Sequence, residues 1–304
     1  MMRIVVASGK GGTGKTTVAT SLAQVAAERD AVRFLDCDVE APNAALFLHP
    51  DLETHRDVGI RVPRVDAQAC TFCGRCAEIC QFHAIAVVGK KVLVFDDLCH
   101  GCGSCTWNCP EQAISEHLAV TGAIDSGTTP EGITFAQGMM NVGQTMGVPI
   151  LRELKKWTPA TRDVPPSTSL RTGPSTSLRA SGALEIRDAP PGASCPVVET
   201  MRGADFALLV TEPTPFGLHD LKQVAAIAHD LGIPAGVVVN RDGIGDDAVG
   251  TWCADSGLPI LLRIPMERRI AVAIASGRTL VDAAPDYRPG FHDLLERIVA
   301  GVNP

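Results

Sequence analysis

The segment GKGGTGKT, Gly9–Thr16, constrains the fold of this chain more than any other part of the sequence. It fits the pattern G-x-x-x-x-G-K-[ST], follows the strand-like run RIVVAS and precedes a helical run beginning at Lys15. Glycines let backbone N–H groups close around phosphate oxygens, and the start of a helix favours negative charge. We therefore expect a strand, a phosphate loop and a helix, with Lys15 on the β- and γ-phosphates and the Thr16 hydroxyl on Mg²⁺.

Short apolar runs recur along the chain with helical stretches between them: RIVVAS, VRFLDCD, ALEIRDA, DFALLVTE, AGVVVNRD and PILLRIP. Nearly continuous Val, Ile and Leu are typical of parallel strands buried on both faces. The pattern predicts an α/β fold with a doubly wound, mostly parallel sheet. It stops for well over a hundred residues between VRFLDCD and ALEIRDA, so we expect an insertion there. After the insertion, PILRELKKW reads as a helix.

Eight of the eleven cysteines repeat one spacing, C-x-x-C-x-x-C-x-x-x-C. This is the bacterial ferredoxin run, and in the ferredoxins the fourth cysteine of each run binds the other cluster. The resemblance predicts two [4Fe–4S] clusters, one on Cys70, Cys73, Cys76 and Cys109, the other on Cys80, Cys99, Cys102 and Cys105. Paired C-x-x-C units also form zinc sites, which is the alternative. We expect residues 66–115 to form an inserted α+β ferredoxin-like domain and residues 1–65 and 116–304 the nucleotide-binding domain.

The form KGGTGKTT, with an extra lysine at Lys10, resembles the deviant Walker A motif of the MinD/ParA/Mrp and nitrogenase iron protein superfamily. FLDCDVEAPN, IRDAPPG and VVVNRD follow in that family's order. The chain is therefore similar to a MinD-superfamily P-loop ATPase with an inserted ferredoxin domain, over almost all of its length except about residues 158 to 183.

The resemblance implies a set of site residues. The expected ATP or ADP contacts are Gly9, Lys10, Gly11, Gly12, Thr13, Gly14, Lys15, Thr16, Thr17, Gly192 and Asn240. The expected Mg²⁺ residues are Thr16, Asp36 and Asp188, and the expected catalytic residues are Lys10, Lys15 and Asp38. By the same resemblance Lys10 reaches the nucleotide of a partner subunit and Asp38 orients the attacking water. Phosphoryl transfer requires mainly positioning and charge neutralisation, which such residues supply.

Three cysteines lie outside the repeated runs. Cys195 stands seven residues after Asp188, and in the nitrogenase iron protein a cysteine at the corresponding offset ligates a cluster between two subunits. A redox or cluster contact is one interpretation of Cys195, and a buried structural thiol is the other. We expect Cys37 and Cys253 to be structural. The C-x-x-C pair of Mrp-type carriers has no counterpart late in this chain.

Charge and hydropathy limit the partners of the chain. A net charge of -7 and a pI near 5.6 argue against a nucleic-acid or anionic-lipid surface. No basic and apolar leader precedes RIVVAS and no apolar run is long enough to span a bilayer, so we expect a cytoplasmic protein. We expect the terminal run FHDLLERIVAGV to be a helix packed on the core. The segment 158–183, which contains STSLR twice, reads as a flexible loop.

Three functions fit these motifs, and ATP hydrolysis is common to all of them. In the first, an ATP-gated electron carrier, nucleotide changes the exposure or potential of the clusters relative to a redox partner protein. The second is an iron–sulfur cluster assembly or carrier ATPase. The third is a redox-sensing positioning ATPase of the MinD/ParA kind. The resemblance implies a homodimer, or a heterodimer with a related ATPase.

Overall fold

The fold is centred on a nine-stranded sheet, in a computed structural model that describes residues 1–159 and 183–302. The strand order is β11-β10-β9-β1-β8-β2-β7-β6-β3. The six predicted apolar runs form β1 (Met2–Ala7), β2 (Val32–Asp36), β8 (Leu184–Asp188), β9 (Phe206–Thr211), β10 (Ala235–Asp242) and β11 (Ile260–Pro265). All of them pair in parallel, as the sequence predicts.

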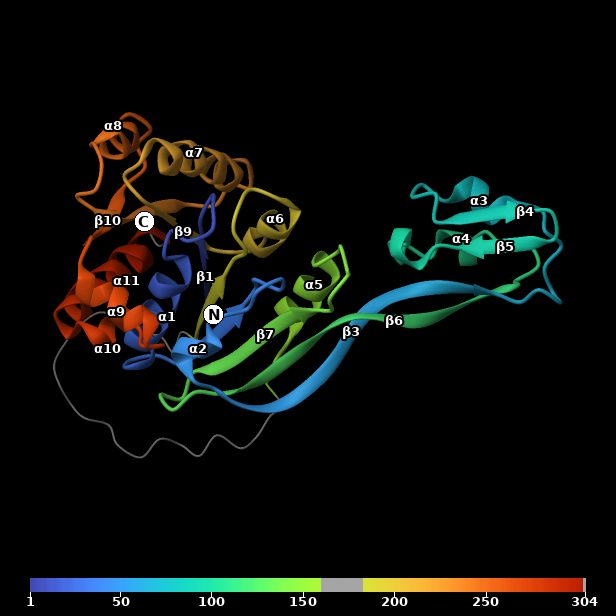
Figure 1. The fold of residues 1–304 in the computed structure, drawn as a ribbon, viewed down its shortest axis with the longest axis horizontal. Helices are drawn as coiled ribbons and strands as arrows, with labels where there is room; N and C mark the ends of the chain where they lie inside the picture. The colour runs from blue at the N-terminus through green and yellow to red at the C-terminus, as the bar shows by residue number, and fades with distance from the viewer. Residues whose placement is uncertain (160–182, 303–304) are drawn as a thin grey trace.

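Helices cover both faces of this sheet, which explains the apolar strands. Ile4 and Val6 on β1 point into a core with α1 (Lys15–Ala27) and α11 (Arg288–Val302), while Val5 and Ala7 point into a second core on the other face. The other helices of the body are α2 (Ala45–Leu48), α5 (Val148–Lys156), α6 (Cys195–Met201), α7 (Pro215–Asp230), α8 (Ala248–Asp255), α9 (Arg268–Ala275) and α10 (Leu280–Ala283). Figure 1 shows α6, α7 and α8 on one side and α1, α9 and α11 on the other.

The two helices that the sequence predicts, one after the insertion and one at the end of the chain, are present. The PILRELKKW run forms α5, and the terminal run forms α11, where Phe291, Leu294 and Ile298 are fully buried. The repeated STSLR segment lies outside the described residues. No helix within residues 1–159 and 183–302 is both long enough and apolar enough to cross a membrane.

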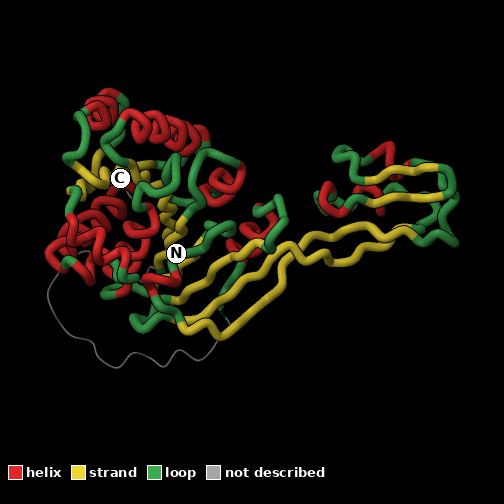
Figure 2. The backbone as a smooth tube through the Cα atoms, viewed as in Figure 1, coloured by secondary structure: helices red, strands yellow, loops and turns green. Residues whose placement is uncertain are grey.

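One edge of the sheet carries three strands that the periodicity did not predict. Strand β7 (Thr134–Met140) is parallel to β2, and β6 (Ile114–Thr128) and β3 (Asp51–Val65) continue the edge antiparallel. β3 and β6 are 15 residues each and leave the body together as a twisted two-stranded ribbon (Figures 1 and 2). The first half of β3 is exposed, so its sequence lacks the apolar signal of a buried strand.

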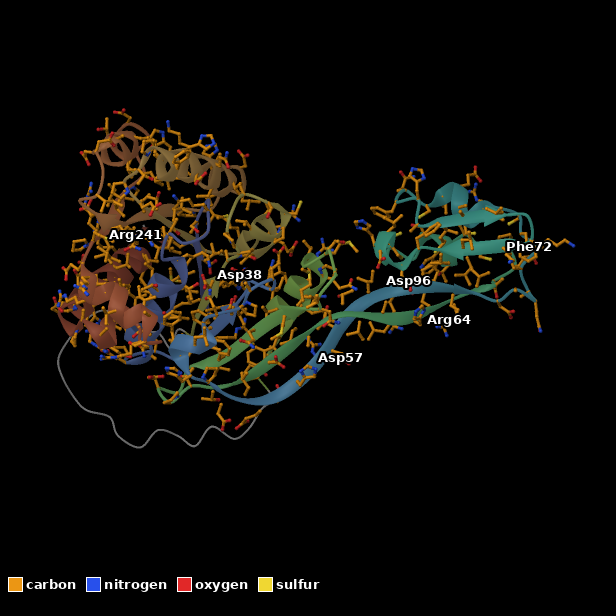
Figure 3. The ribbon with its side chains drawn as sticks, viewed as in Figure 1. Asp38, Asp57, Arg64, Phe72, Asp96 and Arg241 are labelled. Atoms are coloured by element: carbon orange, nitrogen blue, oxygen red, sulfur yellow. The ribbon has the colours of Figure 1, made fainter. Side chains whose placement is uncertain are left out.

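Residues 66–113 form a small unit at the end of this ribbon. It contains α3 (Arg75–Ile79), the hairpin β4 (Ile85–Val88) and β5 (Lys91–Val94), and α4 (Ser104–Trp107). The hairpin corresponds to the expected AIAVVGKKVLVFDD segment. Figure 3 shows Asp57 and Arg64 along the ribbon and Phe72 at the end of the unit farthest from the body. Asp38 and Arg241 lie in the body.

Candidate functional site

The glycine-rich loop lies between β1 and α1, as the motif predicts. Gly12 and Gly14 have φ of 78° and 90°, a backbone region that side chains rarely adopt. A Cβ at Gly14 would also lie 2.2 Å from the Asn240 side-chain nitrogen. That nitrogen donates to the Thr13 carbonyl at 2.7 Å, so Asn240 on β10 closes against the loop. The loop therefore depends on glycine for both its backbone shape and its packing.

Lys15 and Thr16 meet the same carboxylate at the base of the loop. Lys15 Nζ lies 2.5 Å from Asp188 Oδ1, and the Thr16 hydroxyl donates to Oδ2 at 2.6 Å. Burial alone would lower the pKa of Lys15, but the charge and hydrogen bond of Asp188, together with the charges of Asp36 and Asp38, raise that pKa overall. The ammonium thus stays charged at the start of α1, where it can neutralise a phosphate.

The two aspartates after β2 occupy different environments. Asp36 is fully buried, and its oxygens accept backbone N–H groups of Asp38, Asn43 and Ala44 at 2.9 to 3.1 Å. Burial and the nearby Asp188 charge raise the pKa of Asp36 to about 7. Asp38 faces the cavity beside the loop, and burial raises its pKa although Lys15 opposes the shift. Asp36 therefore shapes the turn, and Asp38 is the carboxylate available to a ligand.

A cavity of about 520 Å³ opens beside the loop, within the usual size range of small-molecule sites. The predicted residues that line it are Lys10, Gly11, Gly12, Thr13, Gly14, Lys15, Thr16, Thr17, Asp38 and Asn240. Gly9, Asp36, Asp188 and Gly192 do not line it. The Thr13 hydroxyl and the Asn43 side-chain oxygen are buried without hydrogen-bond partners, which leaves two polar atoms free for a ligand. With the glycine-rich loop on one side and these unpartnered polar atoms, the cavity is the candidate nucleotide site.

The sequence motifs missed one side of this cavity. Asn43 comes from the turn after β2, Phe47 from α2, and Arg241 follows Asn240 on β10. Met266 lies in the β11–α9 connection and Ile270 in α9. Asn43 and Arg241 lie within the segments FLDCDVEAPN and VVVNRD, which was the available signal, but no role was assigned to them there. Met266 and Ile270 carry no signal, because only the fold brings the chain after β11 to the loop.

Lys10 lines the cavity, whereas Gly192 lies outside it and contacts the chain that enters the loop. Lys10 Nζ forms an ion pair with Glu212, whose other oxygen accepts from Arg241 at 2.9 Å. Arg241 also donates to the Gly12 carbonyl at 3.0 Å, so this pair is attached to the loop. The backbone N–H of Gly192 donates to the Ser8 carbonyl at 3.0 Å. The turn after Asp188 is thus joined directly to the segment that enters the loop.

The eight repeated cysteines line two separate cavities in the small unit. Cys70, Cys73, Cys76 and Cys109 line the first, and Cys80, Cys99, Cys102 and Cys105 line the second. These are the two sets of four cysteines expected if the fourth cysteine of each run binds the cluster of the other run. Phe72 borders the first cavity, and Arg61 and Pro63 of the ribbon border the second. The second cavity therefore lies nearer the body.

The two cysteine runs share one backbone geometry. Phe72 and Gly101, two residues after the first cysteine of each run, have φ of 59° and 63°. Their N–H groups both donate to that first cysteine, Cys70 or Cys99, at 3.4 Å. A second pair of N–H groups, four residues after the last cysteine of each run, donates to Cys80 and Cys109 Sγ at 3.3 Å. Backbone N–H donors on thiolate sulfur are a recognised feature of iron–sulfur sites.

Among the described residues, no group of three or more His, Cys, Asp or Glu side chains is placed to hold a metal ion. Each cysteine set is instead spread around a cavity. Cys37 is buried, and burial raises its pKa to about 12, while Cys253 lies on the buried face of α8. Both thus have the structural environment expected of them. Cys195 is exposed at the start of α6, so the buried-thiol interpretation of this residue is wrong.

Comparisons with known proteins agree with this fold. Residues 4–281 match the family described as the CobQ/CobB/MinD/ParA nucleotide binding domain. The chain is 30% identical to the uncharacterized protein MJ0579 of Methanocaldococcus jannaschii, over 99% of both chains. The septum site-determining protein MinD of Pyrococcus horikoshii, solved with Mg-ADP, has a TM-score of 0.58 at 19% identity, covering 100% of this chain and 98% of that one. The cell division ATPase MinD of Pyrococcus furiosus has a TM-score of 0.56 at 21% identity, covering 98% of each. The chain belongs to the CobQ/CobB/MinD/ParA nucleotide-binding family.

Proposed function

We propose that this chain is a Mg²⁺-dependent ATPase that carries two [4Fe–4S] clusters in its insert and couples its nucleotide state to electron transfer through them. The observation that carries the proposal is the division of eight cysteines into two sets of four around two cavities. The nucleotide part is supported by the loop, the Lys15–Asp188 pair and the unpartnered polar atoms of the large cavity.

For ATP hydrolysis, the loop N–H groups and Lys15 would hold the β- and γ-phosphates. Water attacks the γ-phosphorus, the bond from that phosphorus to the β–γ bridging oxygen breaks, and ADP and phosphate leave. Asp38, which faces the cavity, would orient the water, and Thr16 with Asp188 would hold Mg²⁺. Asp36, the third residue expected at Mg²⁺, is left out of this set because its oxygens accept backbone N–H groups. Lys10 would leave Glu212 to reach the nucleotide of a second subunit, because a charge there offsets the negative charge of the transition state.

The residues around each small cavity fit a [4Fe–4S] cluster. Four cysteine thiolates are the ligand set that such a cluster takes, and the N–H donors to sulfur would stabilise its negative charge. A bound cluster would supply one-electron transfer. The chain's own part is to hold the sulfurs, exclude water on the ribbon side and set the exposure of the cysteines. Cys73 and Cys102 are the exposed ligands of the two sets, so each site has one side open to a redox partner.

The pairing of the cysteines provides a direct test. Cys80→Ser with Cys99→Ser removes two ligands of one cavity, so about half of the roughly eight irons should remain. Cys80→Ser with Cys73→Ser removes two residues of one sequence run but one ligand from each cavity, so most of the iron should be lost. Iron content and visible absorption after anaerobic reconstitution distinguish the two variants. The reverse order would contradict the pairing, and a reconstituted wild type without iron would contradict the clusters.

A second candidate is a positioning ATPase whose clusters act as a redox sensor. The comparisons favour this candidate over electron transfer, because both MinD structures come from proteins named for septum placement or cell division. ATP-dependent binding to a surface that changes in strength when the clusters are reduced would favour the redox-sensing positioning ATPase. Reduction of a partner protein that requires ATP would favour electron transfer.

A further inference from the structure

Helix α5 lies between the turn that follows Asp188 and the ribbon that carries the cysteine sites. Its buried face, including Ile150 and Leu154, packs in one core with Val58 of β3 and Ile124 of β6. Gly122 of β6 permits this close approach, since a Cβ there would lie 2.4 Å from Ile150 Cδ1. Figure 1 shows α5 between α6 and the base of the ribbon. Movement of α5 would therefore move the base of the ribbon, because the two are packed without space between them.

A charged contact joins α5 to α6, the helix after the Asp188 turn. Lys155 Nζ donates to the Glu199 carbonyl at 2.5 Å and to the Glu199 carboxylate at 2.9 Å. Arg152, one turn earlier on α5, adds a longer contact of 3.5 Å to the same carboxylate. Glu199 is 9% exposed, so the pair is largely shielded from water. A charge-assisted contact of this kind holds one geometry better than an exposed ion pair does.

The same C-terminal end of α6 is joined to the strand that carries Asp188. Arg187, the preceding residue on β8, is buried and donates to the carbonyls of Thr200 and Arg202 at 3.0 and 3.1 Å. Arg187 also donates to Glu185 at 2.7 Å, which fixes its guanidinium. A shift of the strand that carries Asp188 would thus reach the last turn of α6, where Glu199 contacts α5.

The chain that enters α5 packs against a buried group beside the second cysteine cavity. Met146, two residues before α5, packs against a buried group formed by Ile60, Val62, Ala84 and Cys99. Cys80 packs against the same group. Both cysteines line the cavity nearer the body. The body therefore contacts the insert directly beside two expected ligands of one cluster.

We propose that α5 transmits the nucleotide state to the nearer cysteine site, with Lys155–Glu199 as the input contact and Met146 as the output contact. This proposal rests on the proposed function, since it names the path by which nucleotide and cluster would be coupled. The path is a continuous series of packed and hydrogen-bonded groups, which is what energetic coupling over such a span requires in the simplest case.

Hydrogen exchange of the reconstituted full-length protein tests this path. A non-hydrolysable ATP analogue with Mg²⁺ should slow amide exchange in segments 9–17, 99–105 and 141–147 by about threefold or more. In Lys155→Met the slowing should persist in segment 9–17 and disappear in the other two. Lys156→Met is the matched control, because this lysine is the next residue on α5 and 72% exposed, so its response should equal that of the wild type.

Each outcome bears on the proposal. A wild-type response in Lys155→Met, or a wild type that responds in segment 9–17 but not in 141–147, would overturn it. No response in segment 9–17 would overturn the proposed nucleotide site and this path with it, whereas low iron content would overturn only the clusters. If circular dichroism shows that Lys155→Met misfolds, Glu199→Gln replaces it. This variant keeps the carbonyl contact to Lys155, and it should reduce the response in segments 99–105 and 141–147 at least about twofold.

Discussion

The residues in and beside the nucleotide cavity differ in the partners that they already have. Asp188 accepts hydrogen bonds from both Lys15 and Thr16, and the Asp36 oxygens accept backbone N–H groups. Lys10 is different, because its partner Glu212 keeps a second cation, Arg241, when Lys10 is absent. The function of Lys10 can therefore be tested without exposing an unpaired buried charge.

Replacing Lys10 by alanine should leave ATP affinity within about twofold and lower kcat about 100-fold or more. The reason is that the variant loses a positive charge that stabilises the negatively charged transition state. The measurements are nucleotide binding by calorimetry and steady-state phosphate release. Lys90→Ala is the control, since Lys90 is an exposed residue in the insert hairpin and should change neither value. Unchanged turnover in Lys10→Ala would contradict a hydrolytic role for Lys10.

Glu199 predicts a pH dependence of stability. Burial alone would raise its pKa, but the hydrogen bond and charge of Lys155, with Arg152 and Arg202, lower it below the ordinary 4.5. A carboxyl with a lowered folded-state pKa adds stability above its unfolded pKa and loses it as the pH falls. The free energy of unfolding of the wild type should therefore exceed that of Glu199→Gln at pH 6, and the gap should narrow as the pH falls below 4.5. Urea unfolding at several pH values measures this gap, and a constant gap would contradict the assignment.

At the scale of elements, the ribbon and α5 depend on glycines that leave room for neighbours. A Cβ at Gly122 would lie 2.3 Å from the Met139 carbonyl and 2.4 Å from Ile150 Cδ1. Gly122→Ala should destabilise the protein by about 1 to 3 kcal/mol, since the core must shift to accept it. Gly301→Ala is the control, because its nearest neighbour, Phe206, lies at 3.7 Å. Urea unfolding monitored by circular dichroism measures both changes, and an equal effect would contradict the packing argument.

The elements also show which parts of the fold the sequence can predict. Strands such as β1 and β9 are buried on both faces, so their sequences are continuous apolar runs. Both strands and their parallel pairing could therefore be predicted. The ribbon was not predicted, because the first half of β3 is exposed and lacks an apolar run, and because its pairing with β6 joins residues far apart in the chain. Its existence explains how an insert can stand away from the sheet edge.

For the candidate site the same distinction applies. The loop and the cysteine runs are local motifs, so Lys15 and the eight cysteines could be located from spacing alone. The cavity wall from Met266 and Ile270 and the Lys155–Glu199 contact join segments far apart in the chain. Such contacts depend on tertiary packing, which no local pattern records.

At the scale of the whole molecule, the chain holds a nucleotide cavity in its body and two cysteine cavities on an extended ribbon (Figure 1). We propose that nucleotide binding in the body controls the properties of the clusters in the two cysteine cavities. The most direct measurement is an anaerobic redox titration followed by EPR, on protein with both clusters reconstituted, without nucleotide, with ADP and with a non-hydrolysable ATP analogue. The account predicts a shift of tens of millivolts in at least one reduction potential when the analogue binds. Identical potentials and spectra in all three states would contradict it.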